Sequence, residues 1–458
     1  MQKFKIILSD LHLGAGYAQE GNRLEDFDQD GAFAELLSHV VAESERLDQA
    51  VELIFAGDTF DFLQVPALDL REGFEPARQY SSARYALADE TSSRRKMDLI
   101  LRGHPLFFRA LRDFLGSPLC SVSFIKGNHD VNLHWAQVKA LISAAVGADR
   151  APGRLTFEER CLSREGLYVE HGNQYLEWLN RWPDFEQPHD PDNPRELYLP
   201  VGSRFVYGFV NRLEYRHFWL DGVKPITALI WYLFALDFGC ATEALRALLA
   251  LTPSLIWGRT QVAYALSEAL RSQDQVYHLL EDERRMELLE TNLKERSTFY
   301  NQIEMALDLY GVQRSGGPLG RLGAYGHMVL PRGQDEQRAQ RGHLVRVAEI
   351  KQMQEDARVI VFGHVHEPCA HDLPGGAQYF NAGSWMWSRD MTEADHVAWQ
   401  DLFRNPARYQ DDRRLTYVRV DYDEAGVPHG ALHTLTLDAA PERTLWQRFR
   451  AWVAPRKE

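Results

Sequence analysis

Cysteine is scarce in this chain. The 458 residues include only four, at Cys120, Cys161, Cys240 and Cys369, and their spacing lacks the pattern of a cysteine metal site. The sequence also lacks a cationic leader with an apolar core ahead of its first apolar run, which begins almost at the initiator. These absences together predict a reduced, cytoplasmic setting.

Positive charge is in deficit, and long apolar runs are missing. The 51 Lys and Arg residues against 65 Asp and Glu residues give a net charge of -14. Because duplex DNA requires clustered cations, this balance argues against nucleic acid as a partner. The most apolar segments, 226–236 and 242–251, are shorter than the about 20 residues that a membrane span needs. We expect two helices there, either buried on the protein's own core or forming a groove for an acyl chain.

What the sequence does contain is five short apolar runs, each followed by side chains that bind metals. The runs are rich in Val, Ile, Leu and Phe, as buried strands are, and cover residues 4–9, 51–56, 121–126, 167–170 and 359–362. The side chains that follow are Asp10 and His12, Asp58, Asn128 and His129, His171, and His364 and His366. Because strand ends in α/β sheets converge on one edge, we expect these residues to meet at one point.

The ligand types suit two divalent cations. Carboxylate, amide oxygen and imidazole favour Mn, Fe, Zn, Co or Mg, and no cysteine stands at the five strand ends to select a softer metal. Two neighbouring cations need a shared anionic ligand, and Asp58, in the turn Gly57-Asp58, is the best candidate for it. The remaining ligands divide into two sets: Asp10, His12 and His366 for one metal, and Asn128, His171 and His364 for the other.

The order and wording of these motifs resemble a known family. Asp-Leu-His at 10–12, Gly-Asp at 57–58, Gly-Asn-His-Asp at 127–130, His-Gly at 171–172 and Gly-His-Val-His at 363–366 resemble the calcineurin-like metallophosphoesterases. The resemblance implies a four-layer αββα sandwich and a phosphoric ester hydrolase, in which a hydroxide bridging two cations attacks the phosphorus. It also implies that His129 protonates the leaving group as general acid, with Asp61 or Asp130 orienting its ring.

The hydrolysed bond is left open between a phosphomonoester, a phosphodiester and a pyrophosphate, on a lipid-linked or nucleotide-type substrate. UDP-diacylglucosamine pyrophosphohydrolases look similar in their inserted helical cap, but they carry arginine where this chain has His129. A nuclease of the DNA-repair exonuclease type is the alternative, because those enzymes share the first three motifs. A protein phosphatase is disfavoured, because Phe62 stands where those enzymes carry an arginine. A non-catalytic scaffold typically loses ligands that this chain keeps.

The remaining sequence divides the chain into four parts. Residues 1–180 and 355–440 are expected to form the core, 181–354 a helical cap, and 441–458 a basic amphipathic helix. In the second core part, residues 415–422 and 431–437 predict a hairpin that completes a second sheet, and Asn381 and Ser384 are candidates to support the ligands. Residues 443–458 hold five basic residues and one acid beside apolar residues at helical spacing. They are expected either to dock on the core or to bind the inner face of an anionic membrane.

Overall fold

The computed structural model describes residues 3–16, 21–69, 82–175, 180–220, 222–224, 333–391, 394, 396–409 and 413–436. Most of the predicted cap, both apolar segments within it and the predicted helix at 441–458 lie outside these ranges. Across the ranges given, no helix combines the length and the apolar character that crossing a bilayer requires.

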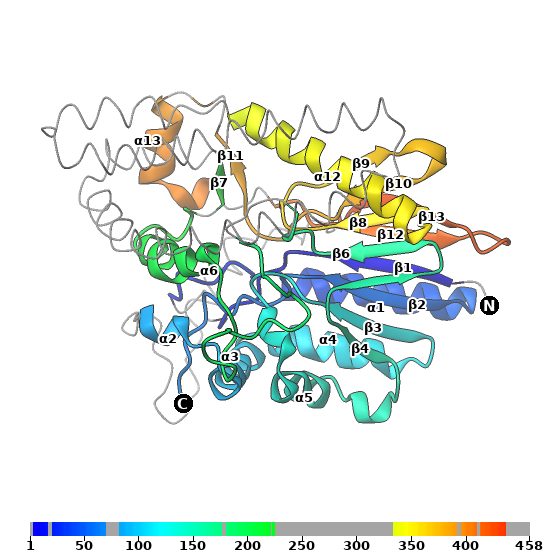
Figure 1. Ribbon diagram of the computed structural model, residues 1–458, viewed down its shortest axis with the longest axis horizontal. Helices are drawn as coiled ribbons and strands as arrows, with labels where there is room; N and C mark the ends of the chain where they lie inside the picture. The colour runs from blue at the N-terminus through cyan, green and yellow to red at the C-terminus, as the bar shows by residue number, and fades with distance from the viewer. Residues whose placement is uncertain are drawn as a thin grey trace, which may run out of the picture.

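The first sheet has six strands in the order β13-β12-β1-β2-β3-β4 (Figure 1). Its parallel strands are β1 (Lys3–Leu8), β2 (Ala50–Ala56), β3 (Cys120–Ile125) and β4 (Leu155–Glu158). The antiparallel strands β12 (Thr416–Tyr422) and β13 (Pro428–Thr434) extend it beyond β1. Three of the predicted strands, β1 to β3, are therefore neighbours whose carboxyl ends share one edge.

The second sheet has five strands in the order β5-β6-β8-β10-β9. Its parallel centre consists of β6 (Leu167–Glu170), β8 (Val359–Phe362) and β10 (Gln378–Asn381), and its antiparallel edges are β5 (Cys161–Arg164) and β9 (Cys369–Asp372). The other two predicted strands, β6 and β8, are thus neighbours in this sheet. A separate pair joins β7 (Val223–Lys224) to β11 (Arg389–Asp390).

Helices lie on the outer faces of the two sheets (Figure 1). The first sheet is covered by α1 (Asp30–Leu47), α3 (Glu90–Gly103), α4 (Pro105–Gly116) and α5 (Ala136–Ala145), and the second by α12 (Gly333–Glu355). The shorter helices are α2 (Ser82–Ala86), η3 (Val131–His134), η4 (Ala148–Arg150), α6 (Val201–Phe205), the π-helix η6 (Val206–Val210), α7 (Asn211–Glu214), η7 (Pro374–Gly376), α13 (His396–Arg404) and η8 (Pro406–Tyr409).

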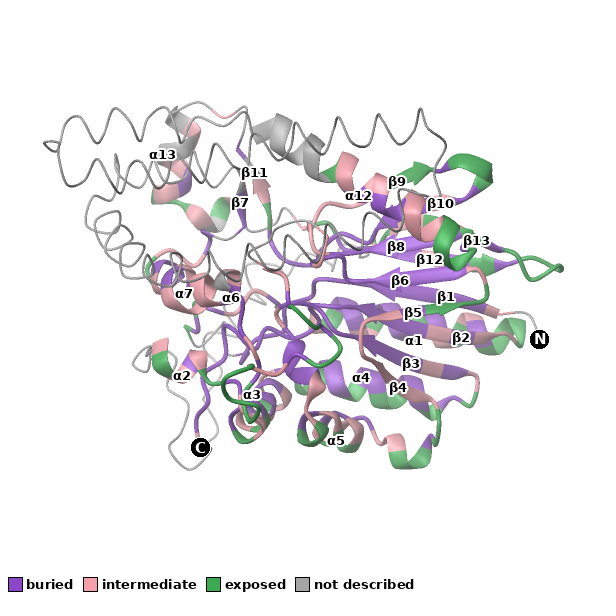
Figure 2. Cartoon of the chain, viewed as in Figure 1, coloured by how far each residue is buried: buried purple, intermediate pink, exposed green. Residues whose placement is uncertain are grey.

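Successive side chains along each strand point to opposite faces of the sheet, which explains how the helices and sheets pack in layers. In β1, Phe4, Ile6 and Leu8 pack against the helices, whereas Ile7 enters the apolar cluster between the two sheets. That inner cluster also receives Val361 of β8, so the sheets pack face to face. Strands buried on both faces read as continuous apolar runs, and both sheets are buried along most of their length (Figure 2). The chain is therefore a layered α/β sandwich of helices, sheet, sheet and helix, as the predicted α/β class requires.

Two expectations about the layout need revision. The hairpin of β12 and β13 was expected to complete the second sheet, but it pairs with β1 in the first. The physical reason is that Val418 and Val420 of β12 point into the cluster between the sheets when β12 lies beside β1. In addition, the end of the predicted cap belongs to the sandwich, because Leu344, Val347 and Ala348 of α12 pack on the second sheet.

Candidate metal centre

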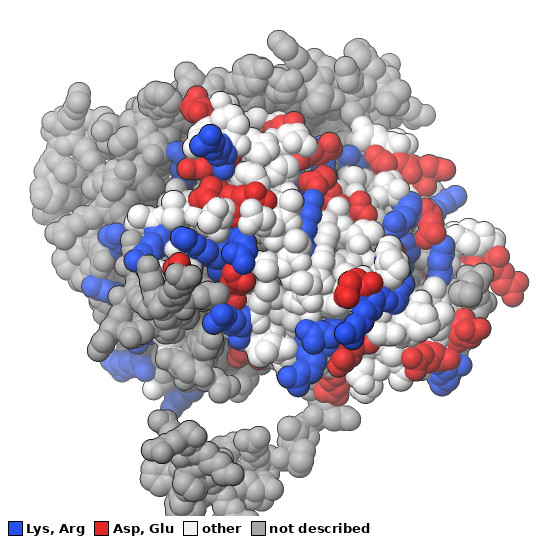
Figure 3. Space-filling view, turned by 90° about the horizontal axis from the view of Figure 1, so that it is seen from below, with Lys and Arg blue, Asp and Glu red and all other residues white. Residues whose placement is uncertain are grey.

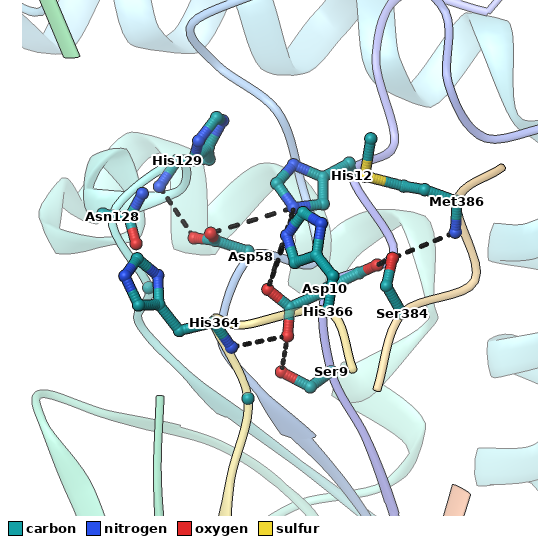
Figure 4. Close-up of polar contacts among 12 residues, drawn as sticks. Ser9, Asp10, His12, Asp58, Asn128, His129, His364, His366, Ser384 and Met386 are labelled. Atoms are coloured by element: carbon teal, nitrogen blue, oxygen red, sulfur yellow. Dashed lines mark hydrogen bonds and ion pairs between the residues drawn. The ribbon is translucent and has the colours of Figure 1, made fainter. Parts of the chain in front are cut away.

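The loops that follow five strands bring the predicted ligands together. They come from the loops after β1, β2, β3, β6 and β8 and are Asp10, His12, Asp58, Asn128, His364 and His366 (Figure 4), together with His171. Three groups of three among the described residues could hold a metal ion, with ligand atoms within 4.8 Å of one another: Asp10, His12 and His366; Asp58, His171 and His364; and His12, Asp61 and His129. In the third group Asp61 already binds the rings of both histidines, so the first two are the candidate metal groups. The two sheets thus contribute to one site.

The first group brings two imidazole nitrogens and one carboxylate oxygen together. His12 Nδ1 lies 3.1 Å from Asp61 Oδ2 and donates to it, so Nε2 is the ring nitrogen that faces the other two side chains. His12 Nε2 and His366 Nε2 are 3.2 Å apart, and His366 Nε2 is 3.2 Å from Asp10 Oδ1. Asp10 is fully buried, and its Oδ1 has no hydrogen-bond partner. Buried acceptors are normally satisfied, so a cation fits this position.

The second group also contains a histidine that is held in place through its Nδ1. His171 Nδ1 donates to the carbonyl of Ala56 at 2.9 Å, so Nε2 is the ring nitrogen that faces the site. That atom lies 3.0 Å from Asp58 Oδ2 and 3.1 Å from Asn128 Oδ1. The His364 ring completes the group, with its centroid 5.2 Å from that of His171. Oxygen and imidazole-nitrogen donors converge here as a divalent cation requires.

Asp58 lies between the two groups. Its Oδ2 is 3.0 Å from His171 Nε2 in one group and 3.9 Å from His12 Nε2 in the other. Burial alone would raise the pKa of Asp58, but the charges of His171 and His129 lower it well below its ordinary value. Asp58 therefore stays ionised in the position where a shared anionic ligand was predicted.

The backbone at the ligands adopts a rare conformation. Five of the eight non-glycine residues with positive φ in the described ranges are Asp10, His12, Asp58, His364 and His366, with φ between 49° and 71°. Each such residue costs about 1–3 kcal/mol and persists only where the surrounding structure enforces it. The packed sandwich therefore carries a conformational cost that is concentrated at the candidate ligands.

The glycines of the motifs allow the ligand loops to approach one another. A Cβ at Gly127 would lie 2.2 Å from Asp58 Oδ1, and one at Gly363 would lie 2.5 Å from Asp10 Oδ2. A Cβ at Gly57 would lie 2.5 Å from His171 Nδ1. Each glycine thus leaves space for a ligand from a different strand, which explains the Gly-Asp, Gly-Asn and Gly-His pairs.

Asp61 is the predicted orienting residue that contacts His129. Its Oδ2 accepts from His129 Nδ1 at 2.7 Å and from His12 Nδ1 at 3.1 Å, while its Oδ1 accepts from the backbone of Leu63 and Gln64. Burial would raise the pKa of Asp61, but His129 and His12 lower it far below its ordinary value. Burial would lower the pKa of His129, but Asp61 and Asp58 raise it above its ordinary value.

Asp130 does not orient His129 as predicted. Its side chain accepts from the backbone N–H of Gly127 at 2.6 Å and of Thr59 at 2.8 Å. It therefore ties the loop of Asp58 to the loop of Asn128. Burial and the neighbouring charge of Asp58 raise the pKa of Asp130 to about 7. The prediction failed because a carboxylate beside His129 in the sequence points toward the backbone of the neighbouring loop.

Supporting residues were partly foreseen. Ser384 Oγ donates to the carbonyl of Asp10 at 2.7 Å, and Asn381 Nδ2 donates to the carbonyl of Gly363 at 2.6 Å, so both candidates support ligand loops. Ser9 was missed. Its hydroxyl donates to Asp10 Oδ2 at 2.5 Å and lies 3.0 Å from the carbonyl of Ala56. Its position directly before Asp10 is the one signal that could have identified it. No protein-family model and no curated protein matches the chain.

Proposed function

We propose that this protein is a metal-dependent phosphoric ester hydrolase of the calcineurin-like metallophosphoesterase type that works with two divalent cations. The proposal rests on the convergence of carboxylate, amide and imidazole side chains from five strand ends, with the buried Asp10 Oδ1 facing the ring nitrogens of His12 and His366. A site with a purely structural role would be expected to pair its acceptors with donors. The helix, sheet, sheet, helix order of the layers supports the same family.

Seven residues would hold the cations, in two sets with Asp58 shared. The sets are Asp10, His12 and His366, and Asn128, His171 and His364. Their oxygen and imidazole donors fit Mn, Fe, Zn, Co or Mg. When bound, such a pair of cations activates water as a nucleophile and neutralises charge on the phosphoryl oxygens.

His129 is assigned as the general acid. Asp61 accepts its Nδ1–H, so the protonated ring presents its second N–H, at Nε2, to the leaving-group oxygen. The raised pKa of His129, caused by Asp61 and Asp58 against the effect of burial, favours the protonated ring that an acid requires. Because the same oxygen of Asp61 also holds His12, the carboxylate fixes the acid relative to the first metal group.

The proposal leaves the type of phosphate bond open. A phosphomonoester, a phosphodiester or a pyrophosphate on a lipid-linked or nucleotide-type molecule fits the chemistry, and binding to an anionic membrane through residues 443–458 remains a prediction. A nuclease is the second candidate on motif grounds. Against it, basic and acidic side chains are interspersed on the face seen in Figure 3, whereas a duplex favours a continuous basic surface.

Asp58→Asn tests the proposal, because it keeps the shape of the side chain and removes the shared charge. We expect elemental analysis to show lost metal, and hydrolysis to fall below detection. The substrate panel comprises chromogenic mono- and diesters, nucleotide sugars, lipid phosphates and single-stranded DNA, each with Mn, Mg, Zn or Co. Asp423→Asn, in the exposed turn between β12 and β13, is the matched control.

The outcomes separate the candidates. Full metal content and wild-type turnover in Asp58→Asn would show that the site assignment is wrong. Hydrolysis of single-stranded DNA alone would select the nuclease. Metal binding by the wild type without hydrolysis of any substrate in the panel would favour the scaffold.

A further inference from the structure

A buried carboxylate lies beside the first ligand loop, outside the metal groups. Glu25 is 1% exposed at its side chain, and it accepts from the backbone N–H of Gly14 at 3.1 Å, of Phe27 at 3.3 Å, and of Gly16 through a short hydrogen bond. Both carboxylate oxygens are therefore used to hold residues 14–16. That segment directly follows the Asp-Leu-His motif.

Glu25 is itself held by a histidine from the opposite side. His104, between α3 and α4, has Nε2 3.2 Å from Glu25 Oε1 and Nδ1 3.1 Å from Asp30 Oδ2. Burial would lower the pKa of His104, but Glu25 and Asp30 raise it to about 10. The His104 ring thus lies between two carboxylates, and its ion pair with Glu25 adds to the backbone hydrogen bonds that hold the Glu25 side chain.

The loop held by Glu25 fits its surroundings closely. A Cβ at Gly14 would lie 2.7 Å from Glu25 Oε2, and a Cβ at Gly16 would lie 2.4 Å from the Cα of Gly103. Gly16 also has a φ of +73°, which favours glycine. Glycine is therefore required at Gly16, whereas a Cβ at Gly14 would displace the Glu25 carboxylate.

Backbone hydrogen bonds connect this loop to Asp61, which contacts His129. The backbone N–H of Leu13 donates to the carbonyl of Thr59 at 2.9 Å, and the N–H of Asp61 donates to the carbonyl of Leu13 at 2.8 Å. Leu13 and Phe60 thus form a parallel bridge between the two loops. Asp61 in turn holds the rings of His12 and His129.

We propose that Glu25 is a positioning residue for Asp61 and His129, acting through the backbone of residues 13–16. This inference rests on the proposed function, since it concerns the geometry of the proposed general acid. A merely structural Glu25 would affect stability alone. A positioning Glu25 also affects the hydrogen bonds at Asp61 and the protonation of poor leaving groups.

Glu25→Gln is the informative variant. An amide has one acceptor oxygen where the carboxylate has two, so its NH₂ group must face one of the backbone N–H donors. Gly14→Ala is the second variant, because it displaces the carboxylate while leaving it charged. Glu52→Gln is the control: the Glu52 side chain is 12% exposed and paired with Lys5, and it lies about 20 Å along β2 from Asp58 at strand spacing.

Two measurements on the full chain report on the positions of the His12 and His129 rings. The first is the pair of Nδ1 resonances of His12 and His129 in ¹⁵N-histidine-labelled, metal-free protein, which requires no activity. We expect both to shift in Glu25→Gln and Gly14→Ala but not in Glu52→Gln. The second is the ratio of turnover on alkyl phosphates to turnover on activated aryl phosphates, at unchanged metal content. We expect this ratio to fall on the order of 10-fold, as small misplacements of catalytic groups do.

Unchanged Nδ1 resonances in either folded variant would overturn the inference, as would an unchanged rate ratio in a folded variant of an active enzyme. If Glu25→Gln does not fold, Gly14→Ala decides the question. A wild-type protein without phosphoesterase activity would refute the proposed function, and the resonances would still test the role of Glu25.

Discussion

The two ends of the sandwich use positive φ angles differently. At the end opposite the site, Gly376 and Gly426 have positive φ in exposed turns, where an added Cβ would meet no atom within 4 Å. At the site, Asp10, His12 and Asp58 have positive φ while no more than 2% exposed. The first end reverses the chain direction in solvent, and the second directs charged side chains into a shared interior.

The two ends therefore differ in the free energy that their backbone conformations cost. Turn glycines adopt positive φ with little penalty because they have no Cβ. Buried Asp and His residues with positive φ cost free energy, and the packing of two sheets offsets it. Substitutions at the site end are therefore expected to change chemistry, and those at the other end to change stability slightly.

The largest effect is expected from Gly363→Ala. A Cβ there would lie 1.8 Å from Ser9 Oγ and 2.5 Å from Asp10 Oδ2, so Asp10 must move. We expect metal at the first group to be lost and hydrolysis to fall below detection, as measured by elemental analysis and turnover. If a folded Gly363→Ala protein kept two metals and wild-type turnover, the contrast between the two ends would have no functional meaning.

His129→Ala is expected to have the next largest effect, and it separates acid catalysis from metal binding. The variant should keep both metals but lose turnover on poor leaving groups by about 10²–10⁴-fold, the contribution typical of a general acid. Activated aryl phosphates should lose much less. An equal loss on both substrate types would mean that His129 positions the phosphate or a metal instead.

His104→Gln should reveal a pH-dependent contribution to stability at the site end. The folded pKa of about 10 lies above the ordinary value of 6.5, so the contribution is fully present below about pH 6.5 and is lost as pH rises toward 10. The free energy of unfolding of the wild type should exceed that of the variant by about 1 kcal/mol or more at pH 6, and the gap should narrow by pH 10. Denaturant unfolding at both pH values measures this, and a gap that widened with pH would contradict the charged state of His104.

The smallest effect is expected at the opposite end, from Gly426→Ala. Its φ of +79° penalises alanine, but no neighbour lies within 4 Å, so about 1 kcal/mol of stability should be lost without a change in turnover. Thermal unfolding and the same hydrolysis assay measure both quantities. A loss of activity here comparable to that of Gly363→Ala would remove the distinction between the two ends.

Much of the candidate site could be predicted because its residues follow apolar strands in the sequence. The strand predicted at 167–170 and the one at 359–362 match β6 and β8, since runs buried on both faces have a clear signal. The role of Asp130 could not be predicted, because the direction of its side chain depends on the backbone of Thr59 in another loop. Glu25 and His104 were missed for a similar reason, as their partners come from three separate elements.

The sequence by itself determined the apolar strands, the α/β class, and the identity and order of the side chains placed after each strand, because these follow from local periodicity and residue chemistry. Only the tertiary structure decided that the strands divide between two sheets, that the hairpin of β12 and β13 joins the first, and that Asp61 rather than Asp130 holds His129. Those choices depend on contacts between distant segments: which face of Val418 is buried, and which donors surround each carboxylate. Such contacts have no local pattern, because they exist only once the two sheets have packed together.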